Sequence, residues 1–191
     1  MNKILYIVDN NQEKNYVYDI VEDTIIYHFS INSGSEVTIN LCEEGVSLFY
    51  YYNNINYDDH IFKIRVNHLK AHTHSEIFNH GVNLLDHKLT YYVDGVVPRD
   101  SSGCICNQDN QIINIENGKS TICPNLLIDN YDVDSNHAAY IGKFRDEALF
   151  YMMSRGISRE QAYRLLLKGF LVPNGADSSE FSLFTKEIEK I

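Results

Sequence analysis

The sequence of 191 residues contains no tryptophan, only three prolines and only four cysteines. Four cysteines are too sparse for a disulfide framework, so we expect free thiols in a reducing compartment. No apolar run approaches the roughly 20 residues that a membrane-spanning helix needs. The first residues, MNKILYIVDNNQEK, hold too few apolar positions for a signal peptide. We therefore expect a cytoplasmic protein.

Basic residues are also scarce, because 16 lysines and arginines face 26 aspartates and glutamates and the formal net charge is -10. A surface that binds nucleic acid or an anionic membrane needs an excess of positive charge, so we expect neither partner. The sequence also lacks a P-loop, a G-x-G-x-x-G motif and a G-x-S-x-G motif. Nucleotide hydrolysis and serine catalysis therefore have no support from the residues.

Residues 3 to about 141 consist of short β-prone runs separated by polar turns. In Glu36–Leu41 and Ile61–Val66 the apolar residues alternate with polar ones, which places them on one face of a strand. This part is predicted to be all-β, and the spacing of its runs suits either a jelly roll or a solenoid. Periodicity alone does not choose between the two. The predicted strands are residues 3–8, 24–31, 36–41, 46–52, 60–66, 88–97, 111–116 and 125–129.

After Gly142 the apolar residues follow helical spacing, so we divide the chain into residues 1–141 and a C-terminal helical segment, 142–191. Asp146 is expected to cap a first helix that ends at Gly156. The apolar residues of this helix are Leu149, Phe150 and Met153.

The second helix has a clear beginning, because Ser158 and Gln161 form a capping box. Gly169 and Pro173 are expected to end it. A last amphipathic segment is predicted over Ser179–Ile191. Its apolar stripe consists of Phe181, Phe184 and Ile188.

Four stretches of the last third match motifs of a known family. Asp129–Gly142 resembles a pattern in which an acidic DDV precedes Ser-His-Gly-Ala. Arg145–Ala162 resembles the signature Asp-Glu-x-Leu-Phe-Tyr-x-x-Ser-Arg-Gly-Ile-Ser-x-x-x-Ala, and Leu165–Phe170 and Pro124–Ile128 match its flanking motifs. The chain is similar to the SufB/SufD family, the scaffold subunits of bacterial iron–sulfur cluster assembly, with the strongest likeness over residues 118–173.

The resemblance implies both a fold and partners. Residues 1–141 would form a right-handed parallel β-helix. Family members pair through their β-helices, as SufB–SufD heterodimers or as homodimers, and their C-terminal helices dock the SufC ATPase. The residues expected to bind that ATPase are Leu149, Phe150, Tyr151, Arg155, Gly156 and Phe170.

The resemblance also implies that His137 contributes to handling of the nascent cluster or its iron. An imidazole can bind iron or relay a proton. The other interpretation is a histidine hydrogen-bonded in the turn between the last strand and the first helix. Gly118 and Lys119 lie where SufB-type chains carry a cysteine, so we expect a SufD-like scaffold that is not an enzyme. We expect no stably bound cofactor, with a transient iron–sulfur cluster or iron as cargo.

The cysteines are a further candidate for cluster handling. Cys104 and Cys106 are two positions apart, so in a strand their thiolates would share one face, and Cys123 could add a third. Thiolate is the soft ligand that iron–sulfur clusters prefer. Free cysteine also behaves as a small apolar residue, so burial of these side chains in a β-helix core explains them equally well.

The competing function is a small metal-dependent enzyme of cupin type. His72 and His74 are two positions apart, so in a strand both could reach one metal, and Glu76, His80 and His87 could complete the site. Exposed histidines in polar β-turns need no ligand, which is the simpler interpretation. A third possibility is a degenerate member of the SufB/SufD family that keeps the fold without a cluster role.

Overall fold

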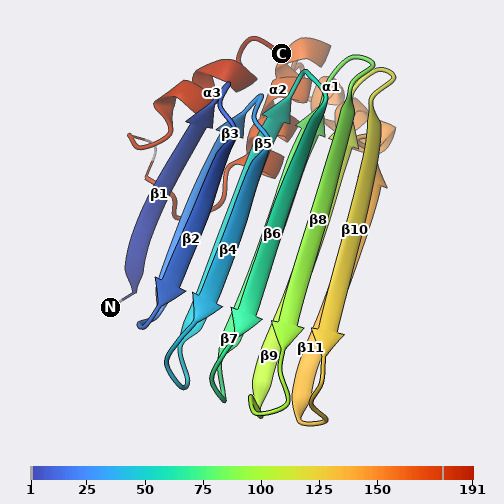
Figure 1. Ribbon diagram of the computed structural model, residues 1–191. Coiled ribbons are helices and arrows are strands. Elements are labelled where there is room, and N and C mark those ends of the chain that lie inside the picture. Colours follow the sequence, from blue (N-terminus) through green and yellow to red (C-terminus); the bar gives the residue numbers. More distant parts are fainter. Residues whose placement is uncertain (1, 178) are drawn as a thin grey trace.

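The computed structural model describes residues 2–177 and 179–191, and these residues form eleven strands and three helices (Figure 1). The strands belong to two sheets that lie face to face. Sheet A consists of β1 (Lys3–Asn10), β3 (Thr24–Ile31), β5 (Ser47–Asn56), β7 (His74–Asn83), β9 (Cys104–Asn114) and β11 (Val133–Gly142). Sheet B consists of β2 (Lys14–Ile20), β4 (Ser35–Leu41), β6 (His60–His68), β8 (Lys88–Val97) and β10 (Lys119–Ile128).

The chain alternates between the sheets, so each strand pairs in parallel with the strand two places further along. Figure 1 shows the chain running down the front sheet and up the rear sheet as it advances from left to right, which makes the coil right-handed. A jelly roll is antiparallel, so this pairing excludes it. The expected right-handed parallel β-helix with C-terminal helices is confirmed.

The coil widens along the molecule. Lys3 pairs with Thr24, 21 residues later, whereas Ser75 pairs with Cys106, 31 residues later. The strands lengthen as well, from 8 residues in β1 to 11 in β9. The solenoid therefore tapers from a broad C-terminal end to a narrow N-terminal end.

The core lies between the two sheets, where alternate side chains of every strand meet. In β4 the inward residues Val37, Ile39 and Leu41 are fully buried. Aromatic rings fill the centre, and Tyr52 of sheet A stacks on Phe62 of sheet B with ring centroids 3.6 Å apart. Strand alternation thus produces an interior that is mostly apolar, interrupted by buried polar residues such as His28, Ser75 and Asn79.

The three helices are α1 (Asp146–Ser154), α2 (Arg159–Leu171) and α3 (Ser182–Ile188). Figure 1 shows them behind the upper part of the β-helix, where α2 and α3 pack on the outer face of sheet A. Phe29 of β3 is fully buried there, stacked on Phe181 with ring centroids 4.4 Å apart. The predicted capping box is confirmed, since Ser158 accepts a hydrogen bond from the Gln161 amide.

Some predicted boundaries were wrong. Helix α2 continues through Gly169 to Leu171, because its last turn packs on sheet A. Asp146 is the first residue of α1, and Arg145 occupies the cap position. Strands β2, β7 and β11 were missed, and β10 begins before Pro124. Proline is tolerated there because β10 is an edge strand.

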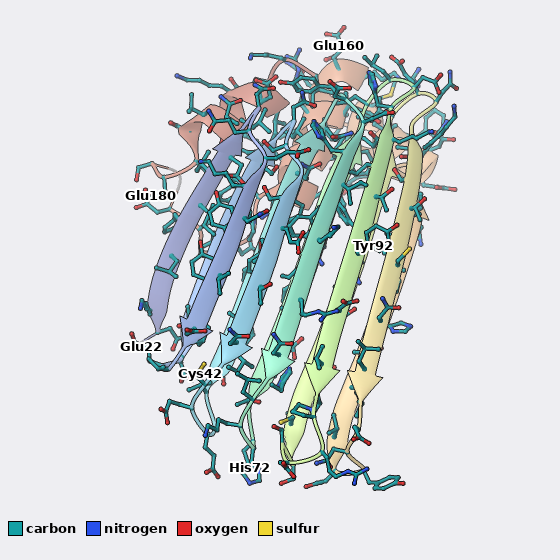
Figure 2. All side chains as sticks on the ribbon, in the orientation of Figure 1. Glu22, Cys42, His72, Tyr92, Glu160 and Glu180 are labelled. Atoms are coloured by element: carbon teal, nitrogen blue, oxygen red, sulfur yellow. The ribbon has the colours of Figure 1, made fainter. Side chains whose placement is uncertain are left out.

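The outer face of sheet B is polar. Lys63 lies 3.4 Å from Glu36, and Arg65 lies 2.7 Å from Asp94 on the neighbouring strand. Figure 2 shows Tyr92 on this face, where the ring is 42% exposed. Cross-strand pairs of this kind are typical of a solvated sheet surface.

Within the described residues, no helix is both long enough and apolar enough to cross a membrane.

Candidate functional site

The broad end of the solenoid is formed by β10 and β11, which are the last strands of their sheets. No strand in the described part of the chain pairs with their outer edges. Figure 1 shows these two strands at the right-hand end of the molecule. An edge strand presents unpaired backbone donors and acceptors, so this end is able to pair with another chain.

The two edges differ in their capacity for pairing. Pro124 lies within β10 and lacks a backbone donor, whereas β11 contains no proline. Strand β11 is therefore the edge better suited to add a further strand.

His137 lies in the middle of β11 and is exposed. It pairs in register with Gln108 of β9, whose side chain is 4% exposed and donates a hydrogen bond to the Asn125 carbonyl of sheet B. Residues in register on parallel strands point to the same side, so His137 points toward the interior at the open end. No described residue hydrogen-bonds to its imidazole. The histidine is therefore part of a strand, and the interpretation as a turn residue was wrong.

The broad end around His137 combines polar neighbours, Ser135 and Gln108, with apolar side chains further along the two strands. Side chains on the inward positions of the last two strands are only partly covered, and Ile141 is 42% exposed. An uncovered apolar interior indicates a surface that another molecule covers. The half-buried members of this group are Ile122, Leu126, Ile128 and Val133.

The structure does not bring the three candidate cysteines together. Cys104 and Cys106 point inward from β9 and are buried, 1% and 0% exposed, whereas Cys123 is half-buried on β10 opposite Tyr92, on the outer face of sheet B. Burial raises the pKa of the Cys106 thiol to about 11, so it stays protonated at neutral pH. Among the described residues, no group of three or more side chains is placed to hold a metal ion.

Cys106 fits its position because residue 95 on the facing sheet is glycine. A Cβ added to Gly95 would lie 2.5 Å from Cys106 Sγ and 3.1 Å from Gln108 Nε2. We expect Gly95→Ala to destabilise the protein by about 1–3 kcal/mol through overpacking, measured by urea unfolding. Adding Cys106→Ala should recover much of that loss.

Gly169→Ala is the matched control, because the Cβ it adds has no atom within 4 Å apart from its chain neighbours and the backbone of its own helix. Gly169 lies inside α2, so this substitution should stabilise the protein by about 1 kcal/mol. Equal stability of Gly95→Ala and wild type would show that the interior near Cys106 is loosely packed.

The structure separates His72 from His74. His72 lies in the turn before β7 with φ +57° and a side chain that is 60% exposed, and Figure 2 labels it at the lower end of the molecule. His74 faces Glu76 instead, with Nε2 and Oε1 2.7 Å apart, and Asn107 donates a further hydrogen bond to Glu76.

The other two histidines of that set have different neighbours. The His80 ring stacks on Phe170, and its Nδ1 donates to the Phe170 carbonyl over 3.0 Å. The imidazole of His87 lies 3.6 Å from Asp59 in a turn. Of the five residues of the cupin-type hypothesis, the structure thus brings together His74 and Glu76 alone and places His72, His80 and His87 elsewhere.

The helical segment carries the second surface of interest. Leu149 is buried beneath α1, while Phe150 and Tyr151 are 68% and 62% exposed. The Arg155 guanidinium lies 5.2 Å from the centre of the Tyr151 ring. Gly156 has φ +84°, the left-handed conformation that ends α1. Phe150 and Tyr151 are therefore free to contact a partner.

Comparison with known proteins bears on both surfaces. The family model described as "SUF system FeS cluster assembly, SufBD core domain" matches residues 20–170, which include β11, α1 and most of α2. The chain belongs to the SufBD family.

Curated relatives agree with the SufBD assignment. The chain is 32% identical over 113 residues to the iron–sulfur cluster assembly protein SufD of Bacillus subtilis, covering 59% of this chain and 26% of that protein. It is 33% identical over 125 residues to SufB of the same organism, covering 63% of this chain and 24% of that protein. A SufBD family protein of Pyrococcus horikoshii is 45% identical over 60 residues, covering 31% of this chain and 13% of that protein. The chain thus spans about a quarter of the SufD and SufB proteins that it matches.

Two buried histidines of this SufBD chain were not singled out from the sequence. His28 Nε2 donates to the Asp9 carboxylate over 2.7 Å, and its Nδ1 accepts from the Tyr50 hydroxyl over 2.7 Å. Burial lowers the pKa of His28. Burial alone would raise the pKa of Asp9, but hydrogen bonds from His28, Tyr16 and Ser35 outweigh it and hold that pKa below its usual value. A neutral imidazole beside a carboxylate satisfies both groups.

The second buried histidine is His68. Its ring nitrogens lie 2.8 Å from the Thr73 hydroxyl and 2.9 Å from the Ser75 hydroxyl. Burial lowers the pKa of His68 to about 4, so the ring is neutral at neutral pH. Only the alternation along β6, which places His68 inward with Phe62 and Ile64, could have revealed it.

Proposed function

We propose that this chain acts as a SufD-like scaffold in iron–sulfur cluster assembly. In this proposal the broad end pairs with a SufB-like subunit or a second copy, and the C-terminal helices dock a SufC-type ATPase. The supporting observation is that the SufBD match over residues 20–170 spans an unpaired β-helix edge carrying His137 and the helices with their exposed aromatic residues. The chain itself would hold and position partners and would not catalyse a reaction.

A scaffold role fits the packing of the broad end. The inward position of His137 at an uncovered end would bring its imidazole to the boundary with a paired subunit, where iron or a nascent cluster would be cargo. Cys104 and Cys106 are buried as thiols behind β11, and Cys123 is on the other face of sheet B. His137 is therefore the residue on which a cluster role depends.

The docking part is tested by co-purification with the SufC-type ATPase of the same genome, without nucleotide and with ATP bound. We expect the wild-type chain to retain the ATPase and a chain lacking Ser154–Phe170 to lose it. Far-UV circular dichroism must show that the deleted chain keeps its β signal. Failure of the wild type to bind in both nucleotide states would refute this part.

The pairing part is tested at β11. Ile141→Arg places a charge at the uncovered end, so it should shift a dimer toward monomer in light scattering after size exclusion. Because Ile141 is outside the helices, the variant should still bind the ATPase. A wild type that is monomeric alone and with a SufB-like subunit would contradict pairing through this end.

The cargo part is tested by anaerobic reconstitution with iron and sulfide. We expect His137→Ala to take up less iron than wild type, with His72→Ala as the matched control of an exposed histidine. Equal uptake by wild type and His137→Ala would indicate a SufBD protein that keeps the fold without a cluster role.

A further inference from the structure

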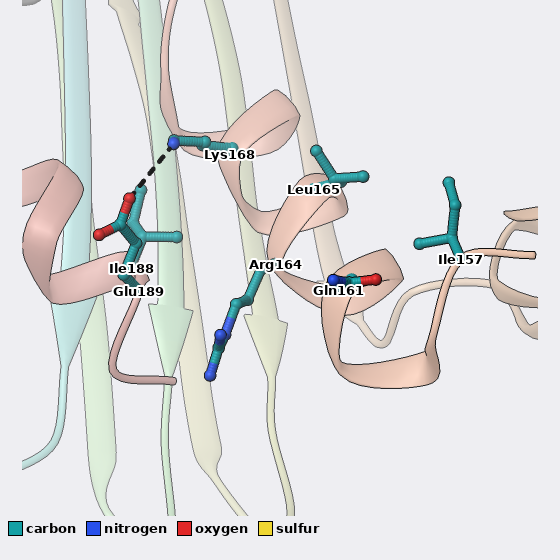
Figure 3. Close-up of a pocket in the computed structure, with 7 residues that line it drawn as sticks. All are labelled: Ile157, Gln161, Arg164, Leu165, Lys168, Ile188 and Glu189. Atoms are coloured by element: carbon teal, nitrogen blue, oxygen red, sulfur yellow. Dashed lines mark ion pairs between the residues drawn. The ribbon is translucent and has the colours of Figure 1, made fainter. Parts of the chain in front are cut away.

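A shallow groove of about 660 Å³ lies between α2 and the end of α3. Figure 3 shows Ile188 and Glu189 of the α3 end on one side of it and Ile157 at its far end. Residues of α2 form the base between them. The groove is distinct from the exposed aromatic residues of α1.

The base of the groove is a stripe along one face of α2. Gln161, Leu165 and Lys168 are four and three residues apart, the spacing that places side chains on one face of a helix. The adjacent face, which begins at Arg164, buries Leu167 and Leu171 against sheet A. Leu165, although apolar, is 47% exposed. Helix α2 therefore has a second, partly apolar face that no described residue covers.

The charge of this region is opposite to that of the whole chain. Residues 143–171 contain six lysines and arginines and three acidic residues, while the chain as a whole has a net charge of -10. Lys168 lies 3.6 Å from Glu189, whereas Arg164 forms no ion pair with any described residue. Arg164 also lines the groove, and Figure 3 shows its side chain projecting from α2 in the opposite direction from Leu165. An uncompensated guanidinium beside apolar side chains favours a carboxylate-bearing partner.

We propose that this groove binds an acidic amphipathic helix of a partner protein. Apolar residues of that helix would cover Leu165 and the exposed part of Ile157, and a carboxylate would pair with Arg164. Helix α2 has 13 residues and is about 20 Å long, which matches a partner helix of three to four turns. The inference rests on the proposed function in treating the C-terminal helices as a docking surface, and adds the face and the chemistry of the partner.

The first test uses a synthetic probe, so it does not depend on the ATPase. Two fluorescein-labelled helical peptides share one leucine stripe, flanked by glutamates in the first and by lysines in the second. Fluorescence anisotropy should show that the glutamate peptide binds wild type, with about tenfold weaker binding to Arg164→Glu and to Leu165→Ser. Arg159→Glu is the matched control, because it makes the same charge change on α2 outside the groove. Equal binding of both peptides, or of wild type and Arg164→Glu, would overturn the inference.

The second test uses the full chain and the SufC-type ATPase. If the ATPase binds through the groove, Arg164→Glu should weaken binding about tenfold at low salt, and this difference should shrink at high salt. Equal ATPase binding by wild type and Arg164→Glu would remove the groove from the interface and leave the proposed function intact. If the wild type fails to bind the ATPase but binds the glutamate peptide selectively, the proposed docking is refuted. The groove would then remain a binding site for another acidic partner.

Discussion

Phe29→Ala should destabilise the protein by about 3–5 kcal/mol, the usual range for removing a buried phenylalanine ring. Phe29 is fully buried on the outer face of sheet A, where its ring stacks on Phe181 and lies 5.1 Å from the Phe184 ring. Loss of the ring leaves a cavity under α3. The helices should therefore loosen before the β-helix unfolds.

Urea unfolding measures the total loss, and hydrogen exchange locates it. Amides of α3 should lose protection in Phe29→Ala while those of β4 keep it. Val17→Ala is the control, since Val17 is 70% exposed on β2 and its removal should change stability little. If the loss were below about 1 kcal/mol with α3 fully protected, the helices would not depend on this aromatic contact.

Stability should fall as the pH drops from about 6.5 to about 4, and His68 should be a main cause. Its pKa is lowered to about 4 in the folded protein, whereas an unfolded histidine titrates near 6.5. In that window the unfolded chain binds more protons, so acid favours unfolding. The stabilisation present above about pH 6.5 amounts to about 3 kcal/mol and is lost progressively toward the folded pKa.

The measurement compares unfolding free energies of wild type and His68→Gln between pH 4 and pH 7. Carboxylates contribute to both proteins, so the difference between their pH slopes isolates His68. We expect His68→Gln to be less stable than wild type at pH 7. Its unfolding free energy should also change less with pH between pH 4 and pH 7. His72→Gln is the control because its side chain is 60% exposed. Parallel slopes for wild type and His68→Gln would contradict the assignment.

Local signals in the sequence predicted part of the fold well. The capping box of Ser158 and Gln161 and the stripe of Phe181, Phe184 and Ile188 are both present as predicted. These features depend on neighbours three or four residues apart, which a sequence displays directly. The family likeness, seen most clearly over residues 118–173, was also correct, and the family model extends the match back to residue 20.

Strand periodicity could not choose a solenoid over a jelly roll, because both bury alternate residues of short strands. It missed β7 because the interior there is polar. Ser75 and Asn79 point inward and are fully buried, and Asn79 donates to Asn110 on the next strand. Such hydrogen bonds join residues about 30 positions apart, so a short stretch of sequence does not show that these buried polar side chains have partners.

The candidate site was harder to predict for a related reason. Two residues that are two positions apart share a face only when both lie in a strand. His72 instead lies in a turn and has a positive φ. His137 could be named from the family motif, but its inward direction and exposure follow from the register with Gln108. The groove beside α2 had no sequence signal, because it needs α3 to form its second wall.

The taper of the coil limits how copies of this chain can assemble. End-to-end stacking would set a first turn of 21 residues against a last turn of 29 in sheet A, so the outlines of the two ends would not match. Two broad ends, by contrast, have equal perimeters and can meet about a two-fold axis. Such a contact covers the exposed edges of both broad ends. The widening of the coil thus acts against head-to-tail fibre growth, to which parallel solenoids with open ends are otherwise prone.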